Sequence, residues 1–124
     1  MRSLILPGAV VALLATVTAS RADGDAVRGE QRFADCAACH SLEPGVVGVG
    51  PSLAGIFSRM AGALTQFRYS PAMRKSGIVW TPQTLDEFIA DPQKRVPANR
   101  MPYAGMTEAA DRADLIAYLQ KAAK

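Results

Sequence analysis

Apolar residues recur at helical spacing in three segments of the chain, and each segment predicts an α-helix. The first covers residues 26–38, where Gly29 and Phe33 lie four positions apart on one face. A glycine inside a helix costs about 1 kcal/mol relative to alanine, so Gly29 indicates close contact with another helix. The expected partner is the last segment, residues 109–123, because it carries a similar apolar stripe formed by Leu115, Tyr118 and Leu119.

The middle predicted helix has sequence signals at both ends. Thr81 is a favourable N-cap and Pro82 suits the first helical position. Pro92 ends the helix because proline lacks the backbone N–H that a helix interior needs. Long segments rich in Gly and Pro, residues 45–58 and 94–107, separate the helices and need a surface to pack on. The pattern predicts one small helical domain with long loops.

The N-terminal residues have the features of a signal peptide. An apolar run at residues 4–17 follows a positive charge, and Ser20 and Ala22 supply the small residues that signal peptidase recognises. We therefore expect a cleaved signal peptide at residues 1–22, a mature domain at residues 23–124 and a periplasmic location. The run is shorter than the roughly 20 residues that span a bilayer, and a Pro-Gly pair interrupts it, so an uncleaved anchor is the second interpretation.

The charge of the mature chain is nearly balanced. Residues 1–22 hold two of the 14 Lys and Arg residues, which leaves 12 against 11 Asp and Glu. Nucleic-acid binding needs a clustered basic face, so this composition predicts no nucleic-acid partner.

The richest chemistry lies in the pentapeptide Cys-Ala-Ala-Cys-His at residues 36–40. This spacing is typical of a c-type haem attachment site. Cys36 and Cys39 can each bond one haem vinyl group, and His40 can then ligate the iron. His40 is the single histidine of the chain, so the sixth iron ligand is another side chain, water or nothing, unless a second molecule supplies an imidazole.

Three other interpretations of the cysteines stay open at this point. A zinc site would need a fourth ligand, and the sequence has no second Cys or His pair. A thioredoxin-like redox pair would need a βαβ pattern around the motif. The third interpretation is a simple disulfide between Cys36 and Cys39.

Matches throughout the mature chain show that the sequence resembles class I c-type cytochromes, close to mitochondrial cytochrome c and bacterial cytochrome c2. The matching positions are residues 24–25, 36–40, 50–57, 69, 77–80, 84–85, 91–92, 101–106 and 112–119. The resemblance implies an all-α, single-domain cytochrome c fold, with helices and long loops wrapped around one haem c that is covalently attached through Cys36 and Cys39.

The sixth ligand is the next question, because Met60, Met73, Met101 and Met106 all lie in the mature chain. A buried methionine is usually a core residue. Met101 lies in a proline-flanked loop far from His40 in sequence, and the resemblance places the axial methionine of the family there. The implied metal ligands are therefore His40 and Met101, with Met106 as the second choice.

The resemblance also implies the residues that support the haem. Pro51 is expected to accept a hydrogen bond from the second ring nitrogen of His40. Tyr69 and Trp80 are expected to donate to a haem propionate whose charge Arg59 balances. Asn99 stands where the family often has a threonine that touches the other propionate.

Two departures from the family pattern concern reactivity and partners. Phe88 stands where the family usually has a tyrosine whose hydroxyl reaches the axial sulfur, so we expect that hydrogen bond to be absent. The lysine ring around the haem edge of mitochondrial relatives is reduced to a small basic patch of Lys94, Arg95 and Arg100 beside Tyr103. Such a patch can steer an acidic partner.

These features predict a soluble, monomeric one-electron carrier that is not an enzyme and binds no small-molecule substrate. Its partners would be redox proteins that dock transiently, such as a membrane oxidase, a bc1-type complex or a periplasmic dehydrogenase. Two alternatives are a haem sensor or peroxidase-like enzyme with a labile sixth ligand, and a dedicated cytochrome subunit of one dehydrogenase.

Overall fold

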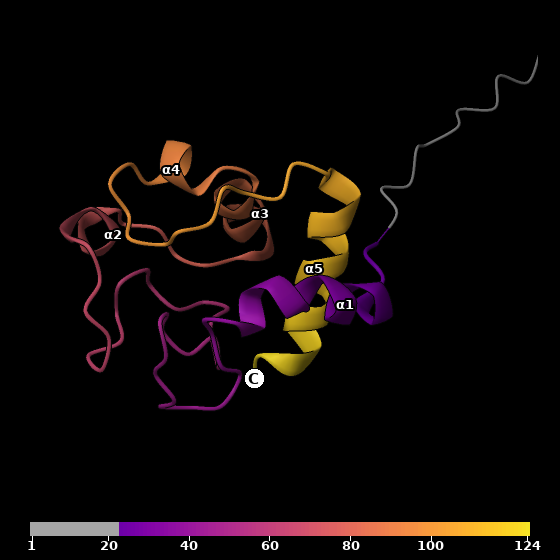
Figure 1. Ribbon diagram of the computed structural model, residues 1–124, viewed down its shortest axis with the longest axis horizontal. Helices are drawn as coiled ribbons and strands as arrows, with labels where there is room; N and C mark the ends of the chain where they lie inside the picture. The colour runs from indigo at the N-terminus through magenta and orange to yellow at the C-terminus, as the bar shows by residue number, and fades with distance from the viewer. Residues whose placement is uncertain (1–22) are drawn as a thin grey trace, which may run out of the picture.

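The computed structural model describes residues 23–124, which contain five helices: α1 (Ala26–Ala37), α2 (Pro71–Lys75), α3 (Pro82–Ala90), α4 (Pro92–Arg95) and α5 (Ala109–Ala122) (Figure 1). The expected signal peptide and its cleavage after Ala22 lie outside the described residues. Within residues 23–124 no strand is formed, and one isolated β-bridge joins Met60 to Val79. The all-α fold class expected from the sequence is therefore confirmed.

Helices α1 and α5 cross and pack against each other (Figure 1). A Cβ atom on Gly29 would collide with the backbone carbonyl of Asp114, so only glycine fits where the two helices meet. Next to this contact, the rings of Phe33 and Tyr118 lie 5.4 Å apart. The close approach predicted from Gly29 is confirmed.

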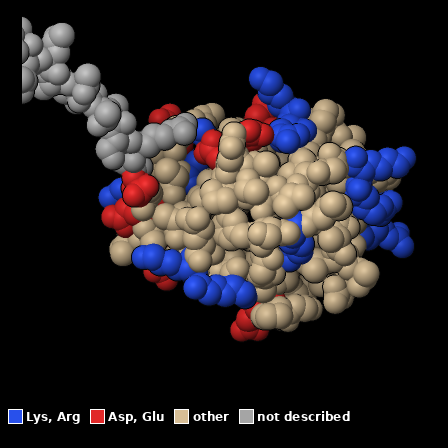
Figure 2. All heavy atoms as spheres, turned by 180° about the vertical axis from the view of Figure 1, so that it is seen from behind, with Lys and Arg blue, Asp and Glu red and all other residues tan. Residues whose placement is uncertain are grey.

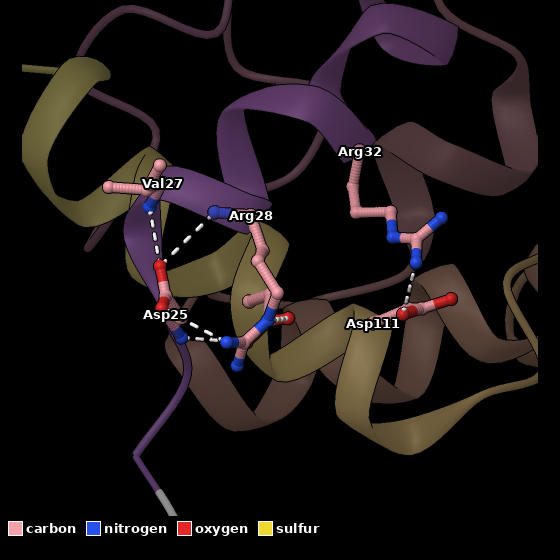
Figure 3. Close-up of polar contacts among 6 residues, drawn as sticks. Asp25, Val27, Arg28, Arg32 and Asp111 are labelled. Carbon is pink, nitrogen blue, oxygen red and sulfur yellow. Dashed lines mark hydrogen bonds and ion pairs between the residues drawn. The ribbon is translucent and has the colours of Figure 1, made fainter.

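Hydrogen bonds fix the start of α1 against α5 (Figure 3). Asp25 caps α1 by accepting from the backbone N–H groups of Val27 and Arg28. The buried carboxylate of Asp114 accepts from the backbone N–H of Asp25 at 2.6 Å and from Arg28 Nε at 2.8 Å. The hydrogen bond from Arg28 holds the pKa of Asp114 below its ordinary value.

The middle helix begins as predicted, but the region around it is more helical than expected. Thr81 caps α3 through a capping box with Thr84, and Pro82 opens the helix. Pro92 ends α3 and also begins α4, because the Asp91 side chain caps the new helix by accepting from Lys94 N–H. The prediction of an irregular loop over residues 94–107 is therefore wrong at its N-terminal end, which belongs to α4.

The core joins the helices to the loops that follow them. Leu115 of α5 is fully buried, and the buried residues around it include Phe33, Leu85, Phe88, Ile116 and Leu119. Arg112 of α5 ties this core to α3 by donating to Asp86 at 2.7 Å. No helix among residues 23–124 is long and apolar enough to cross a membrane.

Candidate functional site

A largely apolar cavity lies between the C-terminal end of α1, helix α3 and the loops around residues 49–59 and 100–103. Most of its wall is aliphatic or aromatic, as expected for a site that holds a large apolar group. The wall also contains a few chemically distinctive side chains: Cys36, Cys39, His40, Arg59, Tyr69, Met73 and Met101. The fold thus brings together nearly all of the site residues predicted from the sequence.

The end of helix α1 sets the two thiols and the imidazole in one turn. The Cys36 carbonyl accepts hydrogen bonds from the backbone N–H groups of Cys39 at 3.1 Å and His40 at 2.9 Å. Both cysteines are free thiols, so the structure does not support a simple disulfide. Burial, helped by the nearby charge of Asp35, raises the pKa of Cys36 to about 11.

The alternative roles of the motif need partners that the structure does not bring to it. A thioredoxin-like pair needs a βαβ unit, and residues 23–124 contain helices without strands. Within residues 23–124, no three side chains from His, Cys, Asp and Glu gather as a metal-binding group. The geometry therefore supports neither the zinc site nor the thioredoxin-like pair.

The ring of His40 is held from two sides. Its Nδ1 atom lies 2.7 Å from the carbonyl oxygen of Pro51. Because a carbonyl only accepts, Nδ1 carries the hydrogen, and Nε2 keeps the lone pair that a metal ion requires. Gly50 packs against the ring so closely that an added Cβ would lie 2.5 Å from Cε1 and 2.9 Å from Nε2. Sequence reasoning missed this role, although Gly50-Pro51 in the loop after the motif was a usable signal.

The methionines separate into two groups. Met101 and Met73 line the cavity, whereas Met60 is 54% exposed. Met106 is buried outside the cavity wall, and its backbone N–H donates to Ile89 O at 2.8 Å. The structure therefore brings Met101 into one cavity with His40 and leaves Met106 out. Met73, contributed by the unpredicted helix α2, is a second thioether in the same wall.

Arg59 places a positive charge in the cavity wall beside Tyr69 and Trp80. Its guanidinium donates to the carbonyls of Ala54 and Ser52, each at 2.9 Å. No carboxylate within residues 23–124 forms an ion pair with Arg59. Burial lowers the pKa of Arg59 and raises the pKa of Tyr69. A half-buried cation without a carboxylate partner suits a ligand that carries its own negative charge.

Asn99 does not take the position expected for it. The side chain is buried, but it is not part of the cavity wall. Its amide hydrogens are donated to the carbonyls of Pro92 and Val96, and its oxygen accepts from Met101 N–H. The structure therefore gives no support for the expected contact between Asn99 and a propionate.

Comparison with known proteins identifies the family. Residues 26–123 match the family model described as Cytochrome c. Cytochrome c2 iso-2 of Magnetospirillum fulvum is 49% identical over 88 residues, which cover 71% of this chain and 92% of that protein. Cytochrome c2 of Blastochloris viridis is 42% identical over 110 residues, or 88% of this chain and 87% of the relative. The chain belongs to the cytochrome c family.

A solved relative agrees with this assignment. Cytochrome cH from Methylobacterium extorquens superposes on this cytochrome with a TM-score of 0.75 at 40% sequence identity, covering 79% of this chain and 99% of the relative. The family carries covalent haem c, and Cys36, Cys39 and His40 form its attachment motif here. The apolar wall, the free thiols and the Arg59 cation all fit that group, so this cytochrome is an electron-transfer protein.

Proposed function

We propose that this cytochrome carries single electrons between redox proteins, with His40 and Met101 as the two axial ligands of its iron. The observation that carries the proposal is the shared cavity, into which the attachment motif and the Met101 loop both lead. When bound, haem c supplies an iron that alternates between its ferrous and ferric states. An imidazole with a thioether raises the reduction potential of such an iron relative to harder ligands.

The proposed role requires that the ligand arrangement stays the same in both oxidation states. The Pro51 carbonyl fixes the tautomer and orientation of His40, so Nε2 stays available for the iron. Phe88 and Ile89 belong to the apolar wall, which limits access of water. A ligand shell that changes little between the two states is what a fast electron carrier needs.

Arg59, Tyr69 and Trp80 are proposed to hold the haem carboxylates. Arg59 is positioned for this role by its bonds to two backbone carbonyls, which leave other guanidinium N–H groups free to donate. The environment of Tyr69, whose pKa burial raises, keeps its hydroxyl protonated as a donor. Such pairing would offset part of the desolvation cost of a carboxylate in an apolar wall.

Two exposed basic surfaces could receive an acidic partner. Residues 44–85 contain no Asp or Glu, and they include the exposed Arg68, Arg74 and Lys75, here called the α2 surface. Figure 2 shows Lys and Arg side chains gathered without acidic neighbours at the edge where Figure 1 places α2. None of these three residues belongs to the described cavity wall.

The second surface is the basic patch near Tyr103. Arg95 is paired with Glu87 at 3.2 Å, so Lys94 and Arg100 supply most of the available charge. Arg100 is exposed and also lines the cavity. We therefore propose this patch as the docking site, because a partner bound there lies beside the redox group. Electron-transfer partners typically bury less than about 1,200 Å² in such complexes.

The compartment is part of the same proposal. Residues 1–22 are proposed to be a signal peptide that is cleaved after Ala22, which would place the mature cytochrome in the periplasm. The features that support this are the short apolar run and the small residues at the cleavage site.

An optical spectrum of the reduced, haem-loaded protein before and after addition of carbon monoxide tests the ligation. An unchanged low-spin spectrum is expected for a closed iron, and Met101→Leu is expected to bind carbon monoxide promptly. Met106→Leu is the matched control because Met106 lies outside the cavity wall. A prompt complex of the wild-type protein would favour a sensor or enzyme. If Met73→Leu binds carbon monoxide promptly and Met101→Leu does not, the sixth iron ligand would be Met73 of α2.

A further inference from the structure

The side-chain amide of Asn99 donates both of its hydrogens to backbone carbonyls of the segment that leads to Met101. The residue is buried, with 8% of its surface exposed. Its nitrogen donates to Pro92 O at 2.8 Å and to Val96 O at 2.9 Å. Its oxygen accepts from Met101 N–H at 2.8 Å. A primary amide has two hydrogens to donate, so none is left for a group in the cavity.

The backbone just before Asn99 is in a conformation that needs support. Residues 96–99 form a turn in which Asn99 N–H donates to Val96 O at 3.2 Å. Pro97 and then Ala98, with a φ of 63°, occupy the two central positions, which is the pattern of a type II turn. The left-handed region is unfavourable for an alanine. The Asn99 side chain offsets this cost by bonding the first carbonyl of the turn.

We propose that Asn99 is the positioning residue for Met101, because its amide ties the end of α4 to the backbone of the sixth iron ligand. This inference rests on the proposed ligation by His40 and Met101. The Met101 carbonyl accepts from Tyr103 N–H at 2.9 Å, so both backbone groups of the ligand are held. A backbone movement that withdraws the Met101 sulfur must break the bond to Asn99 or carry Asn99 and the end of α4 along.

The amide is the functional group that this position requires. Asn99→Asp keeps the shape and the acceptor for Met101 N–H, but it removes both donors. It also places a carboxylate against the carbonyl oxygens of Pro92 and Val96. Asn99→Ala removes all three bonds. Met101 N–H then loses its partner, which is costly, whereas Pro92 O and Val96 O each keep one backbone donor. Both variants therefore favour an open form of the loop.

A pH titration of the ferric, haem-loaded protein tests this role. The signal is the weak far-red absorption band of a thioether-ligated ferric haem, which disappears when methionine leaves the iron. Asn99→Asp and Asn99→Ala are expected to lose the band about one pH unit or more below wild type, a tenfold change in the opening equilibrium. Amide hydrogen exchange of Met101 in Asn99→Ala is expected to accelerate by about tenfold or more for the same reason.

Two controls separate positioning from general destabilisation. Gln93→Ala removes a hydrogen bond to the backbone carbonyl of Asn99 and is expected to leave the midpoint of the pH titration unchanged. Ala34→Gly weakens the exposed face of α1, far from the loop in sequence, and is expected to lower stability without moving the midpoint. If Ala34→Gly moves the midpoint as much as Asn99→Asp does, the positioning role is wrong.

The remaining outcomes distinguish the two proposals. Absence of the band from the wild-type protein would overturn ligation by Met101 itself. A wild-type band together with unchanged midpoints in both Asn99 variants would overturn the positioning role and leave the ligation intact. If neither variant folds, hydrogen exchange of the wild-type protein tests the positioning role. A Met101 N–H that exchanges as fast as an exposed amide would contradict its hydrogen bond to Asn99.

Discussion

Replacing Gly29 by alanine tests the contact that sets α1 against α5. At an exposed helix position this change would stabilise the protein by about 1 kcal/mol. At Gly29 the new Cβ would collide with the Asp114 carbonyl and would lie 2.7 Å from the Cβ of Tyr118. A backbone carbonyl inside a helix cannot move aside as a flexible side chain can, so the two helices must separate.

Helix propensity and the collision act in opposite directions, and their sizes decide whether the free energy of unfolding rises or falls. Overpacking of a close contact costs about 1–3 kcal/mol, and a collision with backbone belongs at the upper end of that range. After subtraction of the helix-propensity gain of about 1 kcal/mol, Gly29→Ala is expected to destabilise the protein by about 2 kcal/mol. For a domain of this size that corresponds to a midpoint lower by about 8–16 °C.

Denaturant unfolding of the haem-loaded protein, followed by far-ultraviolet circular dichroism, measures the change. Ala34→Gly is the matched control because it makes the reverse substitution on the exposed side of the same helix, where a loss of about 1 kcal/mol is expected from propensity alone. A Gly29→Ala protein as stable as wild type, or more stable, would refute the argument that the interhelix distance requires glycine.

Three further predictions concern other parts of the molecule. Ala98→Gly is expected to stabilise the protein by up to about 1 kcal/mol in denaturant unfolding, since glycine accepts the φ of 63°. Asp114→Asn is expected to make the free energy of unfolding less dependent on pH in the acid range. The reason is that the pKa of Asp114 is lower in the folded state, so its carboxylate stabilises the protein above the unfolded-state pKa, and this stabilisation is lost as the pH falls through the folded-state pKa. Arg100→Glu is expected to slow oxidation by hexacyanoferrate several-fold in stopped flow, whereas Arg68→Glu changes it little.

The sequence predicted α1, α3 and α5 because each is long enough for apolar residues to repeat at helical spacing. Helices α2 and α4 have only five and four residues, so no periodicity could reveal them. Their caps were the available signals: Ser70 accepts from Met73 N–H, and Asp91 accepts from Lys94 N–H. A serine or aspartate directly before proline could have been taken as a helix start in both places.

The candidate site divides in the same way. The attachment motif could be predicted because its chemistry depends on adjacent residues, and the hydrogen bond between His40 and Pro51 followed from the family resemblance. The role of Asn99 could not be predicted, because its partners are backbone groups that a turn with a left-handed alanine brings together. Helix α2 contributes Met73 to the cavity, and its position depends on tertiary packing as well.

The two proposed iron ligands are held by different kinds of structure, and this predicts how each would be lost. His40 follows α1, which is locked to α5, so its position depends on the global fold. Met101 lies in a loop, and its backbone N–H is held by one side chain, Asn99. A segment with few regular hydrogen bonds opens at a lower free energy than the core does. Loop variants should therefore release methionine from the iron while the helices stay folded, whereas a change at Gly29 should lower global stability before it alters ligation.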